Sequence, residues 1–384
     1  MTRFTASTTA LAALLATTTL AHAGGVERQA QSPAILFQEG TYVEFGFTYV
    51  DPDISGIQAV NAPPTAAGAD SGDVAPSYSF SSLAYRQDIT DSVSVALIYD
   101  QPVGADVDYQ NAAYLYGLGA GSQAELRAQA LTIAARYQFN ENISVYGGLR
   151  AVTLEGDVRL FNGSGGGATR YQVEADTDHE LGFMLGAAYE RPDIALRVAL
   201  TYYSATEHTF TGTETAGGVT GPSTFNSTIP QQVLLEAQSG VAEGTLVFGS
   251  VRWTDWTEFN ISPPTYIAAV SAGRPLVEYN SDVWTYTLGG ARVLNDTWTL
   301  LGSITYEDQV GGFAGNLGPT DGRTSFGLGA RYTSGNVTIT GGINYTLLGD
   351  AITQAPQPFP NGTTFANFND NTAVGFGLRV GYTF

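Results

Sequence analysis

The sequence predicts an all-β fold, a transmembrane antiparallel β-barrel of about 14 strands. Three observations predict it. Apolar residues alternate with small or polar ones in many stretches, the links between these stretches are alternately short and long, and the chain is 43% hydrophobic but only 14% charged. Soluble domains carry about 25% charged residues, whereas the strands of an outer-membrane barrel turn an apolar face to lipid. The expected strands are 41–50, 77–86, 92–102, 123–139, 143–160, 172–190, 193–209, 230–239, 244–256, 280–294, 297–309, 322–333, 336–348 and 372–384.

The links between these strands alternate in length. The short ones are Gln87–Asp91, Asn140–Asn142, Arg191–Pro192, Gly240–Glu243, Asn295–Asp296 and Ser334–Gly335. The long ones are 51–76, 103–122, 161–171, 210–229, 257–279, 310–321 and 349–371. Outer-membrane barrels have tight periplasmic turns, longer outside loops and an even number of strands. We therefore expect both termini of the barrel's chain to lie on the periplasmic side.

The first 23 residues are expected to be a cleavable export signal. Arg3 gives a positive start, Leu11–Leu20 form a short apolar core, and Ala21-His22-Ala23 is a small-x-small cleavage site. The alternative, a transmembrane helix, needs a longer apolar run. We expect the mature chain to begin near Gly24 and to be exported to the bacterial outer membrane.

The last strand indicates which face is the lumen. One of its faces carries Val374, Phe376, Leu378, Val380, Tyr382 and Phe384. Arg379 is on the other face, and a charge facing lipid at mid-membrane costs about 2–4 kcal/mol, so that face should line the lumen. A soluble β-sandwich or propeller would also alternate, but its polar face would carry more Lys and Glu. The terminal Gly381–Phe384 resembles the closing strand recognised by barrel-assembly machinery. We therefore expect that machinery and outer-membrane lipid as partners.

The composition argues against several functions. The net charge is −20 and lysine is absent, which argues against a nucleic-acid partner. Cysteine is also absent, so the chain offers no thiolate. No nucleotide-binding loop occurs, so transport would have to be passive. We expect no cofactor and no metal, because solvation of loops explains the acidic pairs Asp51/Asp53 and Asp70/Asp73.

An enzymatic alternative depends on one histidine. An outer-membrane lipid enzyme would need a Ser–His pair oriented by a third group. His179, between Asp178 and Glu180, is the candidate base, and the sequence places no convincing serine for it. We therefore expect no enzyme.

The end of the third strand and the loop after it are candidate ligand and gating regions. Pro102 lacks an N–H and Gly104 lacks a packing side chain, so the strand either kinks there or ends. The loop 103–122 gathers Tyr109, Tyr114, Leu115, Tyr116 and Leu118. These side chains form either a landing patch for an apolar ligand or a cluster that packs the loop onto the barrel mouth. Both interpretations stay open.

Three arginines are candidates for holding a carboxylate by bidentate hydrogen bonds. They are Arg150, Arg159 and Arg252. The alternative, that each arginine pairs with an acidic residue of the lumen, is favoured because barrel interiors are polar anyway. In that case each arginine pairs with a lumenal acid such as Glu155, Glu174 or Glu180.

Several segments resemble the long-chain fatty-acid transporter family of Gram-negative outer membranes, the FadL type. Glu27–Gly40, with its Ser32-Pro33-Ala34, resembles the family's N-terminal plug. Trp253–Phe259 resembles its Trp-x-Asp-Trp-x-x-Phe run. Further resemblances lie at Tyr49–Asp53, at Asp282–Trp298 and at Pro319–Arg323, where Gly322 intervenes between Asp and Arg. Together these segments cover nearly the whole mature chain.

The resemblance implies a barrel over residues 41–384, plugged by residues 24–40. Outer loops would capture a hydrophobic ligand, an inner pocket would hold it, and movement of the plug or a kink in the third strand would open a lateral exit. The plug and gating residues would be Ser32, Pro33, Ala34, Ile35, Leu36, Phe37, Pro102 and Gly104. Two departures affect the gating: Ser32 replaces an asparagine and so removes an amide, and the plug is shorter than in the best-known members.

The expected function is passive uptake of hydrophobic small molecules, such as long-chain fatty acids, through an outer-membrane channel. One alternative is a general polar porin, which would have an open, charge-lined lumen and no plug. The other is an outer-membrane lipid-modifying enzyme.

Overall fold

The wall of the barrel is one closed antiparallel sheet. The computed structural model describes residues 26–28, 31–160 and 170–384, so the expected export signal and the first residues of the expected plug lie outside the described residues. The wall is made of these segments: β1 Tyr42–Asp53, β3 Tyr78–Thr90, β4 Val93–Asp100, β5 Gly104–Asp108, β6 Gln123–Gln138, β7 Ile143–Leu160, β8 Tyr171–Arg191, β9 Leu196–Tyr203, β10 Thr206–Ala216, β11 Val219–Ile229, β12 Gln232–Ala242, β13 Thr245–Thr254, β16 Val283–Val293, β17 Trp298–Glu307, β19 Arg323–Ser334, β20 Val337–Leu348 and β23 Thr372–Thr383.

The seventeen segments form a barrel of fourteen strands. β4 and β5 both pair with β6, β9 and β10 both pair with β8, and β11 and β12 face β10 and β9. Each of these three pairs is one strand of the wall interrupted once. β23 pairs with β1 from Tyr42↔Thr383 to Asp53↔Thr372, which closes the barrel. The predicted fold and strand number are confirmed.

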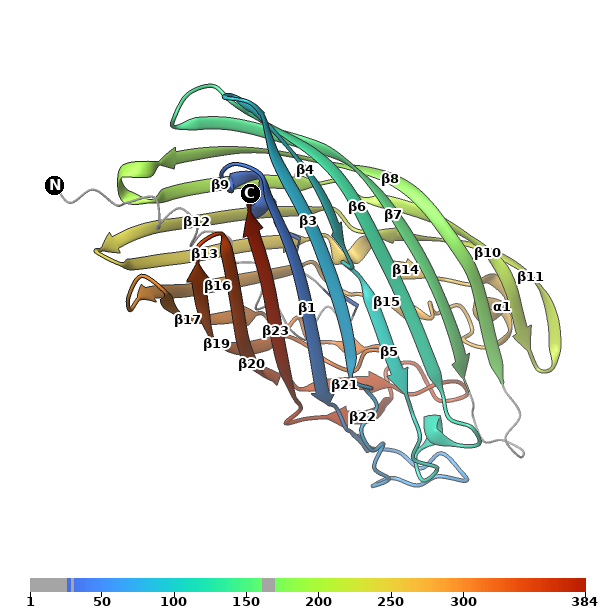
Figure 1. Ribbon diagram of the computed structural model, residues 1–384. Helices are drawn as coiled ribbons and strands as arrows, with labels where there is room; N and C mark the ends of the chain where they lie inside the picture. The colour runs from blue at the N-terminus through green and yellow to red at the C-terminus, as the bar shows by residue number, and fades with distance from the viewer. Residues whose placement is uncertain (1–25, 29–30, 161–169) are drawn as a thin grey trace.

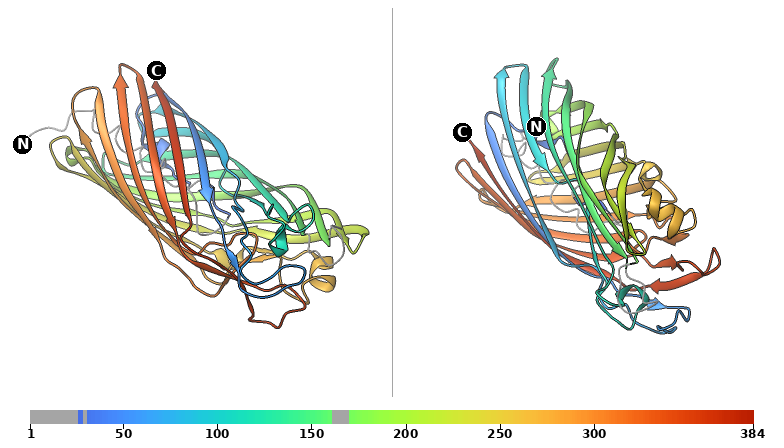
Figure 2. Two further views of the ribbon diagram at one scale, coloured as in Figure 1. Left: turned by 90° about the horizontal axis from the view of Figure 1, so that it is seen from below. Right: turned by 90° about the vertical axis from the view of Figure 1, so that its right-hand side faces the viewer.

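The two ends of the barrel differ (Figure 1). The C-terminus and the short turns lie at one end, here called the inner end. The long links gather at the other, the outer end (Figure 2). There, loop residues form a second sheet in the order β18-β21-β22-β2, with bounds Phe313–Ala314, Ala351–Gln354, Thr364–Phe368 and Ile57–Gln58. The short helix α1, Pro264–Ala269, lies between β14, Asn260–Ile261, and β15, Val277–Glu278.

No helix in the described ranges has the length and hydropathy needed to cross a membrane.

One long link is strand rather than loop. Residues 210–229 were expected to form a loop, but β10 and β11 pair from Thr206↔Ile229 to Ala216↔Val219. The hairpin turns at Gly217 and Gly218, whose φ angles of 56° and 82° suit glycine. The prediction was wrong there because both faces of this hairpin are largely Thr, Ser, Glu and Gly. A strand that does not face lipid lacks the apolar half of the alternation.

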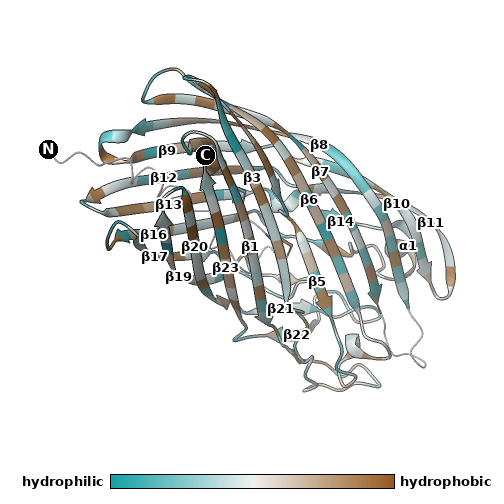
Figure 3. Cartoon of the chain, viewed as in Figure 1, coloured by the Kyte–Doolittle hydropathy of each residue, from teal (hydrophilic) through white to brown (hydrophobic). Residues whose placement is uncertain are grey.

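The alternation elsewhere separates lipid from lumen. On β23, Phe376, Leu378 and Tyr382 are 40–52% exposed on the outer face, whereas Arg379 is 8% exposed and pairs with Glu44 of β1 at 3.1 Å. The prediction that Arg379 faces the lumen is confirmed. Figure 3 shows the same change between hydrophobic and hydrophilic residues along the neighbouring ribbons.

Candidate functional site

The N-terminal segment lies inside the barrel. Arg252 of β13 donates two hydrogen bonds to the Glu27 carboxylate, the Nη2 bond at 2.7 Å. Ser32 Oγ donates to Glu236 of β12 at 2.9 Å. Ala34–Phe37 form one 3-10 turn, η2, and all four side chains are buried. Contacts with the neighbouring strands β12 and β13 therefore hold the segment against the wall.

The third strand of the wall is broken at Gln101–Val103, between β4 and β5. β3 pairs with β4 only from Leu83 onward, and within the described ranges β5 pairs with β6 alone. The wall is therefore interrupted between Tyr78–Ser82 of β3 and the whole of β5. Pro102 and Gly104, the residues predicted to end or kink this strand, flank the break.

The N-terminal segment fills this interruption. Gly104 N donates to Val26 O at 2.7 Å, and Arg28 N donates to Pro102 O at 2.9 Å. The Arg28 guanidinium donates to Asp106 of β5 at 2.7 Å and lies 3.4 Å from the centre of the Tyr78 ring of β3. Residues 26–28 thus take the place beside the broken strand that β3 leaves empty.

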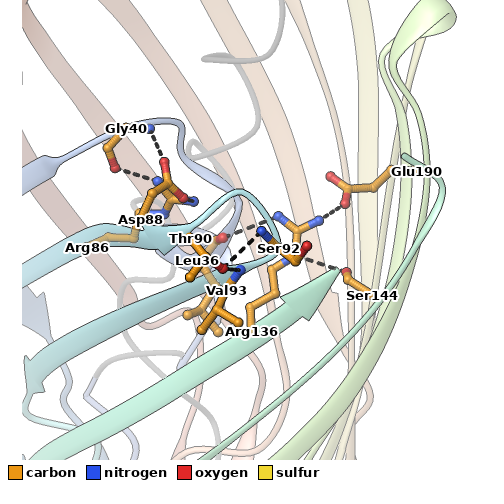
Figure 4. A network of polar contacts seen from close by, with 10 residues as sticks. All are labelled: Leu36, Gly40, Arg86, Asp88, Thr90, Ser92, Val93, Arg136, Ser144 and Glu190. Atoms are coloured by element: carbon orange, nitrogen blue, oxygen red, sulfur yellow. Dashed lines mark hydrogen bonds and ion pairs between the residues drawn. The ribbon is translucent and has the colours of Figure 1, made fainter. Parts of the chain in front are cut away.

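At the inner end, arginines hold η2 and the residues after it (Figure 4). Arg136 of β6 donates to Leu36 O at 3.4 Å and to Ser144 Oγ at 2.9 Å, and it pairs with Glu190. Its guanidinium lies 4.5 Å from the centre of the Phe37 ring, and that of Arg197 lies 4.4 Å from it. Nearby, Arg86 donates to Gly40 O, and Gly40 N donates to Asp88 at 3.0 Å.

A cavity of about 380 Å³ lies at the outer end. It is lined by apolar side chains, two tyrosines, two arginines, Glu278 and several uncharged polar side chains. The aromatic and basic residues are Tyr116, Tyr266, Phe313, Arg170 and Arg274. Burial raises the pKa of the Tyr116 and Tyr266 hydroxyls, so both remain hydrogen-bond donors at neutral pH.

Backbone contacts fix both arginines of this cavity. Arg170 directly precedes β8, and its N–H donates to Leu160 O at 3.1 Å. Its guanidinium donates to Val270 O at 3.4 Å, and that of Arg274 donates to Ala355 O at 3.3 Å. In the part of the chain that the structure describes, neither arginine has a carboxylate within 4.0 Å. Both guanidinium groups therefore keep donors for an anion.

A buried carboxylate anchors the tyrosine side of this cavity. Glu214 of β10 accepts hydrogen bonds from Tyr266 N at 2.9 Å, Ser223 Oγ at 2.8 Å and the Tyr171 hydroxyl at 2.8 Å. Burial alone would raise the pKa of Glu214, but the hydrogen bonds, led by that of Thr265 N, hold the pKa below its ordinary value. The charged form of Glu214 thus fixes α1 beside the cavity.

Two smaller cavities lie deeper. One, of about 40 Å³, is mostly apolar and is lined by Val26, Phe210, Phe225 and others. We call it the inner cavity. The other, of about 60 Å³, lies at the interruption of the wall and is lined by Arg28, Tyr78 and others. We call it the wall cavity, and the one at the mouth the outer cavity.

The aromatic and leucine residues predicted as a ligand patch in the loop 103–122 differ in how deeply they are buried. Tyr109 and Tyr114 are fully buried, and their rings stack at 5.5 Å. Tyr116 and Leu118 are half-buried, and Leu115 is buried. Phe365 of β22 packs against Tyr114 and Tyr116. For Tyr109 and Tyr114 the structure has the packed arrangement, whereas Leu115 and Tyr116 line the outer cavity.

The three predicted arginines have three different environments. Arg252 is buried in the lumen and pairs with Glu27, which was not among the acids proposed for it. Arg150 is 3% exposed and lies 5.2 Å from the centre of the Tyr203 ring. Arg159 is exposed on the outside of the wall, so its expected lumenal position was wrong. Arg150 and Arg159 are an odd number of residues apart on β7, which puts them on opposite faces.

The sequence analysis missed Arg170, Arg274 and Tyr266. A signal was present, because Arg170 and Arg274 are the only two basic residues within the seven long links. The alternation could not reveal that the two links meet, since 104 positions separate them. Tyr266 carried no comparable signal.

The histidines of the described residues bear on the enzymatic alternative. His179 lies exposed on the outer face of β8. The other histidine within the described residues, His208, is buried and hydrogen-bonds to Asp178 at 3.0 Å and to Thr206 at 3.1 Å. In the described ranges, no group of three or more His, Asp or Glu is arranged to hold a metal ion.

The chain is similar to known outer-membrane transport proteins in sequence and in fold. The family model described as outer membrane protein transport protein (OMPP1/FadL/TodX) matches residues 4–384. A Pseudomonas aeruginosa FadL homologue aligns with a TM-score of 0.74 and 16% identity, over 91% of this chain and 92% of that one. The P. putida toluene transporter TodX aligns at 0.64 and 15%, over 90% and 91%.

A third solved structure is similar to the same degree. The Ralstonia pickettii toluene transporter TbuX aligns with a TM-score of 0.63 and 15% identity, over 92% of this chain and 94% of that one. No curated protein sequence matches the chain. At these identities the structural likeness establishes the fold.

Proposed function

The chain belongs to the family of outer membrane protein transport proteins (OMPP1/FadL/TodX), and from this we propose that it is a channel for passive uptake of apolar molecules that end in a single acid group, such as long-chain fatty acids. The proposal goes beyond the family in naming the ligand. It also assigns the outer cavity as the place of capture.

One observation supports a ligand that ends in an acid group. The two arginines of the long links meet at one cavity, where they lie among apolar and aromatic side chains, Glu278 and a few uncharged polar groups, in a chain with net charge −20. Guanidinium groups bind a carboxylate through two parallel hydrogen bonds. Apolar walls favour a hydrocarbon tail by about 25 cal/mol per Å² buried. An amphiphile with one negative group is the molecule that uses both features.

The deeper cavities support a route for the tail. The inner cavity is apolar, and the wall cavity lies where β3 and β5 are unpaired. Residues 24–40 would act as the plug of this route, with Val26–Arg28 across the interruption and Ala34–Phe37 at the inner end. Displacement of Arg28 from Asp106 and Tyr78 would open the interruption toward the membrane. Neither step needs an energy source beyond the ligand's gradient.

The test removes both charges of the outer cavity and compares an acid with its ester. The variant Arg170→Gln/Arg274→Gln should slow uptake of dodecanoate by about tenfold or more, because a hydrogen bond to a charged group contributes about 1.5–3 kcal/mol. Uptake of methyl dodecanoate should change little. The measurement is uptake of the two labelled compounds by proteoliposomes.

A matched control removes two arginines that face outward. Arg127→Gln/Arg159→Gln lowers the charge equally but does not touch the cavity, so uptake of both compounds should stay at the wild-type rate. Equal slowing of acid and ester by the cavity variant would exclude a carboxylate site at Arg170 and Arg274.

Neutral aromatic hydrocarbons are the second candidate ligands. The rings of Phe210 and Phe225, 5.2 Å apart, line the inner cavity, and two of the similar structures are called toluene transporters. The same variant separates the two candidates. Toluene uptake that exceeds dodecanoate uptake and is unaffected by Arg170→Gln/Arg274→Gln would favour the hydrocarbon.

A further inference from the structure

One side chain lines all three cavities. Leu317 lies in the link between β18 and β19, and it is 8% exposed. It contributes to the outer cavity, to the inner cavity and to the wall cavity. The outer cavity shares no other lining residue with either deeper cavity. Ala105 is the second residue common to the two deeper ones. Leu317 is therefore the one residue that these three cavities have in common.

The position of Leu317 is fixed by its neighbour in sequence. The Tyr109 hydroxyl donates to Asn316 O at 2.6 Å, and Asn316 Nδ2 donates to Gln354 O at 3.1 Å. Tyr109 itself is fully buried and stacked on Tyr114. The buried tyrosine thus ties the link that carries Leu317 to the loop after β5.

The far side of the same link is fixed as well. Asp321 accepts hydrogen bonds from Val310 N and Gly311 N, both at 2.8 Å. Gly318 N donates to Gly315 O at 3.1 Å, which closes a tight turn around Leu317. A side chain held from both sides cannot move aside as freely as one on an open loop.

We propose that Leu317 is the specificity-determining constriction between the outer cavity and the two deeper cavities, and that Tyr109 positions it. The inference rests on the proposed transport function. A ligand that passes from capture to exit must pass the isobutyl group of Leu317. The cross-section of the ligand, rather than its length, is then what the constriction selects.

The first test varies the volume at position 317. Leu317→Ala should raise the uptake of an acid with a bulky ring at its tail, relative to straight dodecanoate, by about tenfold or more, because even one methylene in an apolar pocket changes discrimination by about tenfold or more. Leu317→Phe should shift the ratio the other way. Heat-modifiable gel mobility checks that each barrel has folded.

The second test uses two buried, stacked tyrosines, of which one makes a hydrogen bond through its hydroxyl and the other does not. Tyr109→Phe removes the hydroxyl that holds Asn316 and should move the uptake ratio in the direction of Leu317→Ala. Tyr114→Phe is the matched control, since in the described structure the buried Tyr114 hydroxyl has no hydrogen-bond partner. Equal ratios for the two tyrosine variants would remove Tyr109 from the positioning role.

The third test exploits the absence of cysteine from the chain. In Leu317→Cys, benzyl methanethiosulfonate applied from outside should react through the outer cavity and then block uptake of dodecanoate. Val219→Cys, at the 75% exposed tip of the β10–β11 hairpin, should react without effect on uptake. If the Leu317→Cys variant takes up dodecanoate at the same rate after labelling as before it, the proposal that Leu317 is a constriction is overturned.

The outcomes separate the two proposals. If the wild-type protein takes up neither acid, the proposed transport function fails, and the constriction fails with it. If the wild type takes up dodecanoate but the Ala and Phe variants at position 317 discriminate as the wild type does, the constriction alone is excluded.

Discussion

The outer and inner ends of the lumen are built from different chemistry. The outer end has cavities lined by side chains such as Tyr116, Phe210 and Leu317. The inner end, like the outer one, has guanidinium groups, but there Arg136 pairs with Glu190, and the groups of Arg136 and Arg197 lie against the Phe37 ring. An apolar ligand is favoured where it displaces water from apolar walls. At the inner end it would have to separate buried ionic partners, which costs about 3–5 kcal/mol when one partner is lost. The difference favours capture outside and exit before the inner end.

The largest expected effect comes from deleting the segment that joins the two ends. Removal of residues 24–37 should leave a folded barrel, because β1 pairs with β3 and β23 without it. Small polar solutes should then pass, as measured by swelling of liposomes in a sugar solution. A folded deletion variant that is as tight as the wild type would show that the wall and loops close the lumen by themselves.

The next effect tests the outer attachment of that segment. Arg252→Met should remove the two hydrogen bonds that Arg252 donates to the buried Glu27 carboxylate, at a cost of about 3–5 kcal/mol. Detachment should raise the thiosulfonate reactivity of Val26→Cys more than a hundredfold, since about 1.4 kcal/mol is a factor of ten. The double variant Arg252→Met/Glu27→Gln should restore most of the protection. Equal reactivity in the single and double variants would exclude the ion pair as the attachment.

A smaller effect tests the inner attachment. Phe37→Leu keeps an apolar side chain but loses the ring under the two guanidinium groups, a contribution of about 0.5–2 kcal/mol. Solute leakage should rise slightly, whereas Phe37→Tyr, which keeps a ring, should stay close to the wild type. If Leu and Tyr leak alike, the cation–π contacts do not hold η2.

The smallest effect on function tests which end is which. A peptide tag between Gly217 and Gly218, at the tip of the β10–β11 hairpin, should be labelled on intact cells and should leave uptake unchanged. A tag at Gly335, in an inner-end turn, should be labelled only after the outer membrane is opened. Surface labelling at Gly335 would reverse the orientation.

The wall could be predicted from sequence because its signal is local. Each lipid-facing strand repeats an apolar residue at every second position, so the last strand alone separates Phe376 and Leu378 from Arg379. The hairpin 206–229 was missed for the same reason, since its outward face is mostly threonine and lacks the apolar residues of a lipid-facing strand. The face of Arg159 could be read by counting along β7 from Arg150, because the register shift with β8 at Leu154/Gly156 leaves Arg150 and Arg159 on opposite faces of β7.

The candidate site was less predictable because its contacts are distant in sequence. Glu27 meets Arg252 across 225 positions, and Tyr109 meets Asn316 across 207. No local pattern encodes such pairs. The cluster of tyrosines after β5 did indicate a special loop, but whether a ring is exposed or buried depends on partners such as Phe365, which the alternation does not reveal.

The backbone bonds of Val26 and Arg28 determine how the interruption behaves after it opens. A strand edge with free N–H and C=O groups is a template for any extended chain that reaches it. Residues 26–28 occupy that edge at Pro102 and Gly104 with two hydrogen bonds. When they leave, each buried group that stays without a partner costs about 1–3 kcal/mol. We propose that the open state is therefore the higher in free energy, and that residues 26–28 pair with this edge again once a ligand has passed.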